Sequence, residues 1–266
     1  MNETLTRTLS GAVYIVILVG CALFPMSFVA LFGIFLLLAV FEFCELTQLP
    51  KLGPLLTSAL LYFLFTSLPL SNMMELALLV PTIYVSVRLL LFLFSSKFIG
   101  LDKTTKYVYL IGYVVLPMVF ITKLPFEKGQ FRPEVIISIF ALIWSNDTFA
   151  FLVGKGFGKR KLLPSVSPKK TVEGFFGGWI FALLFAIPIA IWLVKEPILF
   201  WLVIATIVSY VGTIGDLVES KFKRIAGVKD SGRIMPGHGG ILDRLDSVIF
   251  VAPFVFLFYQ IVFYVS

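Results

Sequence analysis

Residues 200–220, FWLVIATIVSYVGTIGDLVES, form an apolar run that carries two carboxylates, Asp216 and Glu219, close to its end. The run is long enough to cross a bilayer as a helix. A carboxylate inside such a helix costs roughly 3 kcal/mol on insertion scales unless it is paired. We therefore expect Asp216 to lie about one turn inside the end of a membrane-spanning helix, facing a cationic side chain or a metal ion.

Apolar runs of this kind recur along the chain, in which 59% of 266 residues are hydrophobic. Soluble domains hold about 45–50% apolar residues. Runs of roughly 18–25 residues predict helices and not the shorter alternating strands of a membrane barrel. We predict an all-α, polytopic integral membrane protein with one domain over residues 1–266. Hydropathy indicates nine spans, at residues 8–23, 26–46, 53–70, 74–96, 106–122, 133–154, 173–194, 197–220 and 241–264, the first two separated at Pro25.

Basic residues predict the orientation of these spans. With a cytoplasmic N-terminus, 17 lysines and arginines fall on the cytoplasmic side and 4 on the opposite side. The net charge of +7 then reflects loops beside anionic lipid headgroups. Nucleic acid is not expected as a partner, because no soluble basic domain accompanies the charge. We expect a bacterial-type inner membrane protein whose two most polar loops face the cytoplasm.

The more charged of these loops, residues 215–246, reads GDLVESKFKRIAGVKDSGRIMPGHGGILDRLD. Asp216 and Glu219, and likewise Asp243 and Asp246, are three residues apart and so share one face of a helix. Two helices joined by this loop bring both pairs to one membrane level, where hard oxygen ligands suit Mg²⁺. The four carboxylates are the predicted metal ligands. Alternatively, Asp243 and Asp246 cap a helix N-terminus, where negative charge is favoured.

Basic residues and the glycine-rich segment PGHGG, residues 236–240, lie between the two pairs. Glycine lets backbone N–H groups approach an anion, and the helix that starts near Ile241 points its positive end to the same place. This pattern is typical of phosphate binding. The candidate residues are Lys223, Arg224, Lys229, Gly237, Gly239, Gly240 and Arg244. His238, the only histidine, has either a catalytic role or a structural hydrogen-bonding role.

The second polar loop, residues 147–174, reads DTFAFLVGKGFGKRKLLPSVSPKKTVEG. Asp147 lies within an apolar helix and needs a partner. Lysines and hydroxyls spaced among glycines suit a polyphosphate. The candidate substrate-binding residues here are Asp147, Ser167, Lys169, Lys170 and Thr171. We expect the catalytic region to comprise residues 144–174 and 212–247.

The segments SKFKR at 220–224, KDSG at 229–232 and PGHGGILDRLD at 236–246 closely resemble the signature of the phosphatidate cytidylyltransferase family, also called CDP-diacylglycerol synthases. Residues 147–174 resemble that family's second characteristic region, with Phe151 at a position where tyrosine is expected.

The resemblance implies a Mg²⁺-dependent membrane enzyme, a homodimer, that converts CTP and phosphatidate into CDP-diacylglycerol and pyrophosphate. Asp216 and Asp243 are then the main metal ligands, supported by Asp246 and Glu219. Whether a second cation assists is left open. The expected catalytic residues are Asp216, Asp243, Asp246, Lys223, Arg224 and His238.

Two other functions are compatible with parts of this pattern. A CTP-dependent kinase for polyprenol or dolichol would transfer the γ-phosphoryl group to a hydroxyl and would need a base such as His238 or Asp147. A cation transporter could use the intramembrane residues Asp147, Asp216 and Arg88. The transporter is disfavoured because the charges gather at one membrane face, whereas transporter sites lie near the midplane.

Overall fold

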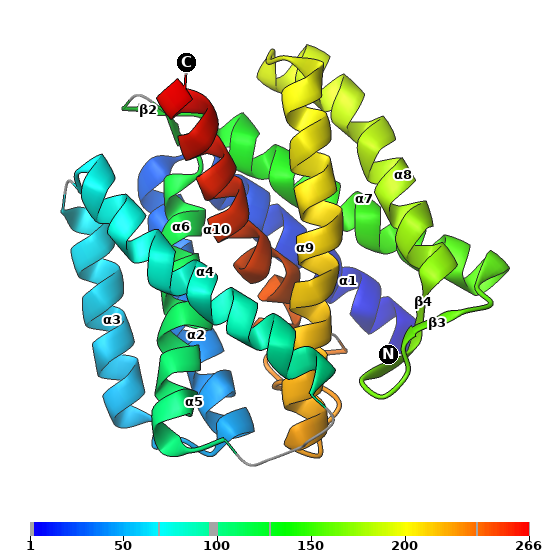
Figure 1. Cartoon of the computed structure of the whole chain (residues 1–266), viewed down its shortest axis with the longest axis horizontal. Helices are drawn as coiled ribbons and strands as arrows, with labels where there is room; N and C mark the ends of the chain where they lie inside the picture. The colour runs from blue at the N-terminus through cyan, green and yellow to red at the C-terminus, as the bar shows by residue number, and fades with distance from the viewer. Residues whose placement is uncertain (1–2, 69, 96–100, 128, 238, 266) are drawn as a thin grey trace.

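The structure is a computed structural model that describes residues 3–68, 70–95, 101–127, 129–237 and 239–265. Figure 1 shows a bundle in which α9 (Ile198–Ile225) and α10 (Leu242–Val265) lie between two groups of helices. The first group comprises α2 (Pro25–Thr47), α3 (Leu52–Ser67), α4 (Asn72–Phe94), α5 (Lys103–Tyr109) and α6 (Leu116–Lys123). The second comprises α7 (Pro133–Phe157) and α8 (Val172–Pro188), and α1 (Glu3–Ala22) packs on α2 and α7.

In the described part of the chain, seven helical segments are long and apolar enough to cross a membrane. Two shorter apolar helices, Thr8–Ala22 and Leu52–Ser67, accompany them. The all-α polytopic membrane fold is therefore confirmed. Each of the nine spans indicated by hydropathy coincides with one of these helical segments, whereas the number that crosses the membrane, and the side of the N-terminus, stay predictions.

Short irregular segments interrupt two of these spans and connect others. The π-helical turns η1 (Leu110–Val115) and η2 (Ile189–Val194) continue α5 and α8. Helix α1 ends at Ala22 and α2 begins at Pro25, as the proline predicted. Two small antiparallel sheets, β1 (Phe126–Glu127) with β2 (Gln130–Phe131) and β3 (Lys161–Leu163) with β4 (Ser167–Thr171), were not predicted.

The end of α9 differs from the prediction in a way that affects the site. The predicted span ends at residue 220, but the helix continues to Ile225 and includes Lys221 and Lys223. Lys221 is buried and donates to the carbonyl oxygens of Phe92, Leu93 (3.2 Å) and Ser95 (2.8 Å) at the end of α4. A lysine at the carbonyl end of a helix stabilises its unpaired acceptors. Lys221 therefore joins α9 to α4 and does not face the loop.

Glycines allow close packing where the polar residues gather. A Cβ atom on Gly178 of α8 would lie 2.6 Å from the carbonyl oxygen of Asn146 in α7, and one on Gly215 of α9 would lie 2.7 Å from that of Asp246 in α10. Side chains at these positions would force the helices apart. The close α9–α10 crossing places Asp216, next to Gly215, beside the first turns of α10.

Candidate active site

A cavity of about 510 Å³ lies between α7, the start of α8, the β3–β4 hairpin and the α9–α10 crossing. Residues from both polar loops line it, although about fifty residues separate those loops in the sequence. The acidic lining residues are Asp147, Asp216, Asp243 and Asp246, and the basic ones are Lys155, Lys161, Lys169, Lys170 and Arg244. Polyphosphates and divalent cations are the ligands that such a mixture of charges suits.

Lys170, at the end of the hairpin, forms an ion pair with Asp216 on α9, with 2.5 Å between Nζ and Oδ2. The Ser220 hydroxyl donates to the other oxygen of Asp216 at 3.2 Å. Burial opposes the charge of the Lys170 ammonium, but Asp216 and Asp147 outweigh this effect and raise the pKa of Lys170 above its ordinary value. Lys170 is therefore the cationic partner that the sequence required for Asp216.

Lys223 on α9 bridges two other carboxylates. Its Nζ lies 2.5 Å from Glu219 Oε2, one turn earlier on the same helix, and 2.6 Å from Asp243 Oδ1 on α10. Glu219 is fully buried and Lys223 is nearly so. A buried lysine between two carboxylates holds α9 and α10 together, since removing one partner would leave an uncompensated charge.

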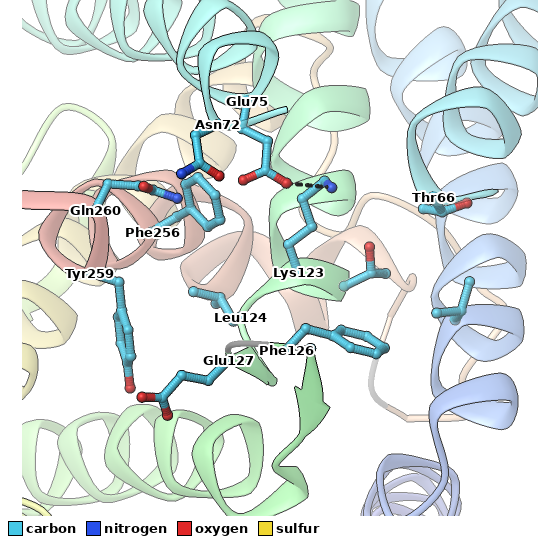
Figure 2. A pocket seen from close by; sticks show the side chains of 13 residues that line it. Thr66, Asn72, Glu75, Lys123, Leu124, Phe126, Glu127, Phe256, Tyr259 and Gln260 are labelled. Atoms are coloured by element: carbon cyan, nitrogen blue, oxygen red, sulfur yellow. Dashed lines mark hydrogen bonds and ion pairs between the residues drawn. The ribbon is translucent and has the colours of Figure 1, made fainter. Parts of the chain in front are cut away.

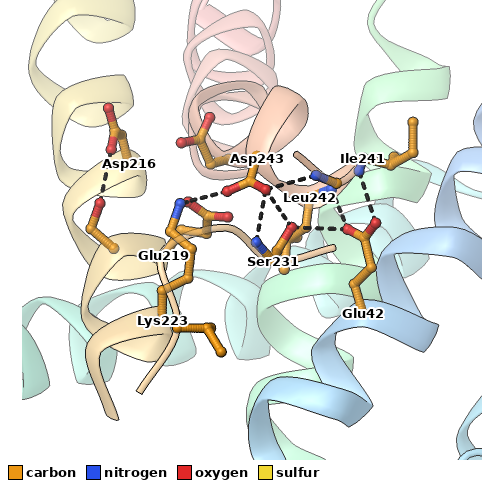
Figure 3. A network of polar contacts seen from close by, with 12 residues as sticks. Glu42, Asp216, Glu219, Lys223, Ser231, Ile241, Leu242 and Asp243 are labelled. Atoms are coloured by element: carbon orange, nitrogen blue, oxygen red, sulfur yellow. Dashed lines mark hydrogen bonds and ion pairs between the residues drawn. The ribbon is translucent and has the colours of Figure 1, made fainter. Parts of the chain in front are cut away.

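Asp243 uses its second oxygen to anchor the loop before α10. Asp243 Oδ2 accepts hydrogen bonds from the backbone N–H of Ser231 (2.8 Å), the Ser231 hydroxyl (2.9 Å) and the backbone N–H of Gly240 (2.8 Å), as Figure 3 shows. Both oxygens of Asp243 thus have protein partners, and the carboxylate fixes the loop before α10; its predicted role as a metal ligand stays a prediction.

Asp147 and Asp246 differ from these paired carboxylates. Among the described residues, neither forms an ion pair. Asp147 accepts from the Asn146 side chain at 3.2 Å, and Asp246 accepts from the backbone N–H of Ser247 at 2.7 Å. Two carboxylates without cations in one cavity are hard oxygen donors of the kind that Mg²⁺ takes, so the donor set fits this ion. As they stand, no three acidic, histidine or cysteine side chains within the described ranges converge closely enough to hold a metal.

The other predicted residues of the hairpin region lie at or beside the cavity. Lys169 lines it directly. Ser167 begins β4 and pairs with Leu163 across the hairpin. The Thr171 hydroxyl accepts from the backbone N–H of Gly174 at 3.1 Å, so Thr171 caps α8 while also lining the cavity.

The predicted residues of the 215–246 loop are placed less uniformly. Arg244 lines the cavity, but Lys229 lines a separate groove beside Glu45. Arg224 donates to the carbonyl oxygens of Val166 (3.3 Å) and Val228 (3.1 Å), and so ties the hairpin to the end of α9.

The glycine-rich segment of that loop is tightly packed. Gly237 and Gly239 have positive φ values of 75° and 83°, which favour glycine. A Cβ on Gly239 would lie 2.5 Å from Asp243 Oδ2. Gly240 donates its N–H to that same oxygen. His238 lies outside the described residues.

Glu42, on α2, belongs to this network but was not among the predicted residues. Its carboxylate accepts from the backbone N–H groups of Ile241 and Leu242. The rule that marks an acidic residue inside an apolar span as functional could have identified it, because Glu42 interrupts the apolar run of residues 26–46.

A second cavity, of about 540 Å³, lies along the C-terminal half of α10 and is shown in Figure 2. Its only described lysine, Lys123, pairs with Glu75 at 2.7 Å. Glu127, also in its lining, pairs with Arg132. The burial of Arg132 opposes its charge, but the hydrogen bonds that it donates to nearby glutamates raise its pKa above the ordinary value. With its lysine neutralised, this cavity lacks the cations that a polyphosphate requires.

The profile of the Cytidylyltransferase family matches residues 5–262, so this chain belongs to that family. Proteins named phosphatidate cytidylyltransferase are among its relatives. The protein of Bacillus subtilis is 50% identical over 130 residues, which cover 48% of each chain. That of Staphylococcus saprophyticus is 53% identical over 120 residues, 44% of this chain and 46% of the relative. The chain thus spans about half the length of the curated relatives it matches.

Proposed function

We propose that this protein is a phosphatidate cytidylyltransferase, which joins CTP and phosphatidate to give CDP-diacylglycerol and pyrophosphate. The observation that carries the proposal is the single cavity in which hairpin lysines face the aspartates of α9 and α10. Family membership and the names of the relatives support the same reaction.

The surroundings of the cavity suit a lipid substrate. Phe151 lines the cavity on α7, yet this residue is 66% exposed, and Leu152 beside it is also exposed. An exposed apolar face on a membrane helix contacts acyl chains. A phosphatidate molecule could therefore place its phosphate among the lysines while its acyl chains remain along α7 in the bilayer.

The nucleophile in this reaction is an oxygen of the phosphatidate phosphate. It attacks the α-phosphorus of CTP, the bond from that phosphorus to the oxygen bridging to the β-phosphate breaks, and pyrophosphate leaves. Because the second pKa of a phosphate monoester is about 6, the nucleophile is ionised near neutral pH and needs no general base. Catalysis then consists of aligning two anions and neutralising the charge on the departing pyrophosphate.

Each side of the cavity contributes one part of this task. Lys155, Lys161 and Lys169 line the cavity without an ion pair to any described residue, so they are available to the phosphates. The pair of Lys170 with Asp216 orients the hairpin over α9. Mg²⁺ commonly takes one or two carboxylates together with substrate phosphate oxygens. Asp246, Asp147 and Asp216 would supply the carboxylates and the bound phosphates the remaining donors, and the ion would neutralise phosphate charge. Asp243 and Glu219 then support that site through Lys223, and a second cation remains open.

We place the protein in a bacterial-type inner membrane with its N-terminus and the cavity on the cytoplasmic side. The charge bias of the loops supports this orientation. CTP is a cytoplasmic nucleotide, so the cavity must open to that side. A homodimer is proposed on the family resemblance alone, and crosslinking in native membranes would test it.

The decisive experiment follows the label of [α-³²P]CTP in purified, reconstituted protein supplied with phosphatidate. We expect chloroform-soluble label and pyrophosphate in the presence of Mg²⁺ and neither with EDTA. A lipid kinase would instead release CDP and leave the α-label in water. Failure to form labelled lipid with Mg²⁺, in protein that retains CTP binding, would overturn the proposed reaction.

A further inference from the structure

Glu42, near the C-terminal end of α2, is an acidic residue that is only 1% exposed. It lies on α2, between Phe43 and Phe41, and it does not line the candidate cavity. A buried carboxylate without partners would be strongly unfavourable, so its contacts explain why it is tolerated.

The partners of Glu42 come from the start of α10 and the loop before it. Oε1 accepts the backbone N–H of Ile241 at 3.0 Å, and Oε2 accepts that of Leu242 at 2.8 Å. The Ser231 hydroxyl lies 3.0 Å from Oε2. Figure 3 shows the side chain reaching from α2 to the beginning of α10. Glu42 thus satisfies N–H groups that the helix itself leaves unpaired, where a negative charge is also favoured.

The loop is closely fitted to this carboxylate. A Cβ atom on Gly232 or on Gly240 would collide with the carboxylate oxygens of Glu42. Neither glycine has a positive φ, so backbone conformation does not require glycine at these positions. The close approach of Glu42 is the reason that side chains are excluded there.

The same contacts lead to the carboxylates of the cavity. The Ser231 hydroxyl lies within hydrogen-bond distance of both Glu42 and Asp243, and with a single proton it donates to one at a time. Asp243 in turn holds Lys223. One helical turn after Leu242, Asp246 lines the cavity. A shift at the start of α10 would therefore move Asp246 and Arg244 together.

We propose that Glu42 is a positioning residue, which fixes the start of α10 so that Asp246 and Arg244 face the substrates. The inference rests on the proposed cytidylyltransferase reaction for its kinetic readout. Glu42 touches neither substrate in this arrangement and acts only through α10 and Ser231.

The test compares Glu42→Gln and Gly232→Ala with wild type in nanodiscs. In Glu42→Gln, the amide nitrogen must face an N–H donor, so one contact to α10 is lost. In Gly232→Ala the charge remains but the carboxylate is displaced. We expect both to lower kcat, roughly 100-fold for Glu42→Gln, with the KM for CTP within about threefold, because a small misplacement of reacting groups mainly affects turnover. Glu75→Gln, which removes a carboxylate from the other cavity, is the matched control and should behave as wild type.

Hydrogen exchange provides a readout that does not depend on activity. Peptides covering residues 239–246 should exchange faster in both variants, while peptides from α7 and α8 remain unchanged. Turnover of Glu42→Gln within about threefold of wild type would overturn the proposal. So would accelerated exchange throughout the bundle, which would mean that Glu42 only stabilises the fold. If wild type forms no CDP-diacylglycerol, the proposed function fails, and the exchange data alone decide whether Glu42 fixes α10.

Discussion

The hairpin region and the α9–α10 junction both hold many charged side chains, but they differ in how those charges are paired. In the hairpin region, Lys155, Lys161 and Lys169 line the cavity without an ion pair to any described residue. At the junction, Lys223 lies between two carboxylates and Lys221 is bound to backbone carbonyls. The unpaired region suits the changing charges of substrates, and the paired region suits a rigid support. Among the described residues, one ion pair joins the hairpin region to the junction, that of Lys170 with Asp216.

The largest effect should come from the residue at which the two regions meet. We expect Asp216→Asn to lower turnover about a thousandfold or more, since loss of a metal ligand removes several kcal/mol of charge neutralisation. Expression and the melting temperature in detergent should remain near wild type, because Asp216 is partly exposed to the cavity. The label-transfer assay with CTP measures the rate. Activity above about a tenth of wild type would remove Asp216 from the metal site.

Asp243→Asn should reduce both activity and stability. This variant therefore distinguishes a residue that supports the fold of the site from a residue that only binds the metal. Either orientation of the asparagine amide places its NH₂ group against a donor, Lys223 on one side or the N–H groups of Ser231 and Gly240 on the other. Lost hydrogen bonds to a charged group are worth roughly 1.5–3 kcal/mol each.

We expect about a hundredfold loss of turnover in Asp243→Asn and a melting temperature lower by roughly 3 °C or more. Differential scanning fluorimetry and the same rate assay measure the two effects. Asp246→Asn is the comparison, with loss of activity but unchanged melting. If Asp243→Asn melts like wild type while Asp246→Asn does not, the assignments of support and ligand are reversed.

The helices of this fold could be predicted because a membrane span is decided by local hydropathy. The proline break before α2 and the long run of α9 needed no tertiary information. The β3–β4 hairpin was missed, since its strands have only three and five residues, β4 is mostly polar, and their order comes from pairing and from Arg224. The continuation of α9 through Lys221 was also missed, because the carbonyl groups that bind this lysine come from α4.

The residues of the site could largely be predicted from the sequence, but the role of each residue could not. Spacing and charge identified Asp216 and Asp243, whereas their different partners depend on which loop reaches each of them. Glu42 was missed because its role depends on N–H groups about two hundred residues later in the chain. Lys229 was predicted to bind substrate because it lies between the two carboxylate pairs in the sequence. In the structure it follows the turn after α9 and lines a different groove.

A double-mutant cycle measures how far the two regions act as one. We expect Lys170→Ala and Lys223→Ala each to lower kcat/KM by roughly tenfold or more, through loss of a charge beside a carboxylate. Their partners Asp216 and Glu219 lie on one face of α9, so the double variant should depart from additivity. A coupling below about 0.5 kcal/mol would mean that the hairpin and the junction act independently.

The smallest effect is expected from His238→Gln. If phosphatidate attacks as an ionised phosphate, no residue has to accept a proton, and the variant should retain turnover within about tenfold of wild type. Its pH–rate profile should also keep the rise that comes from ionisation of the lipid phosphate near pH 6. Rates from pH 5.5 to 8.5 at saturating CTP measure both properties. Complete inactivity with CTP binding preserved would instead make His238 a proton acceptor, because glutamine retains hydrogen bonding but cannot take up a proton. That result would move an essential catalytic group into the region that we interpret as a support, and it would favour the kinase reaction, in which a hydroxyl must lose its proton.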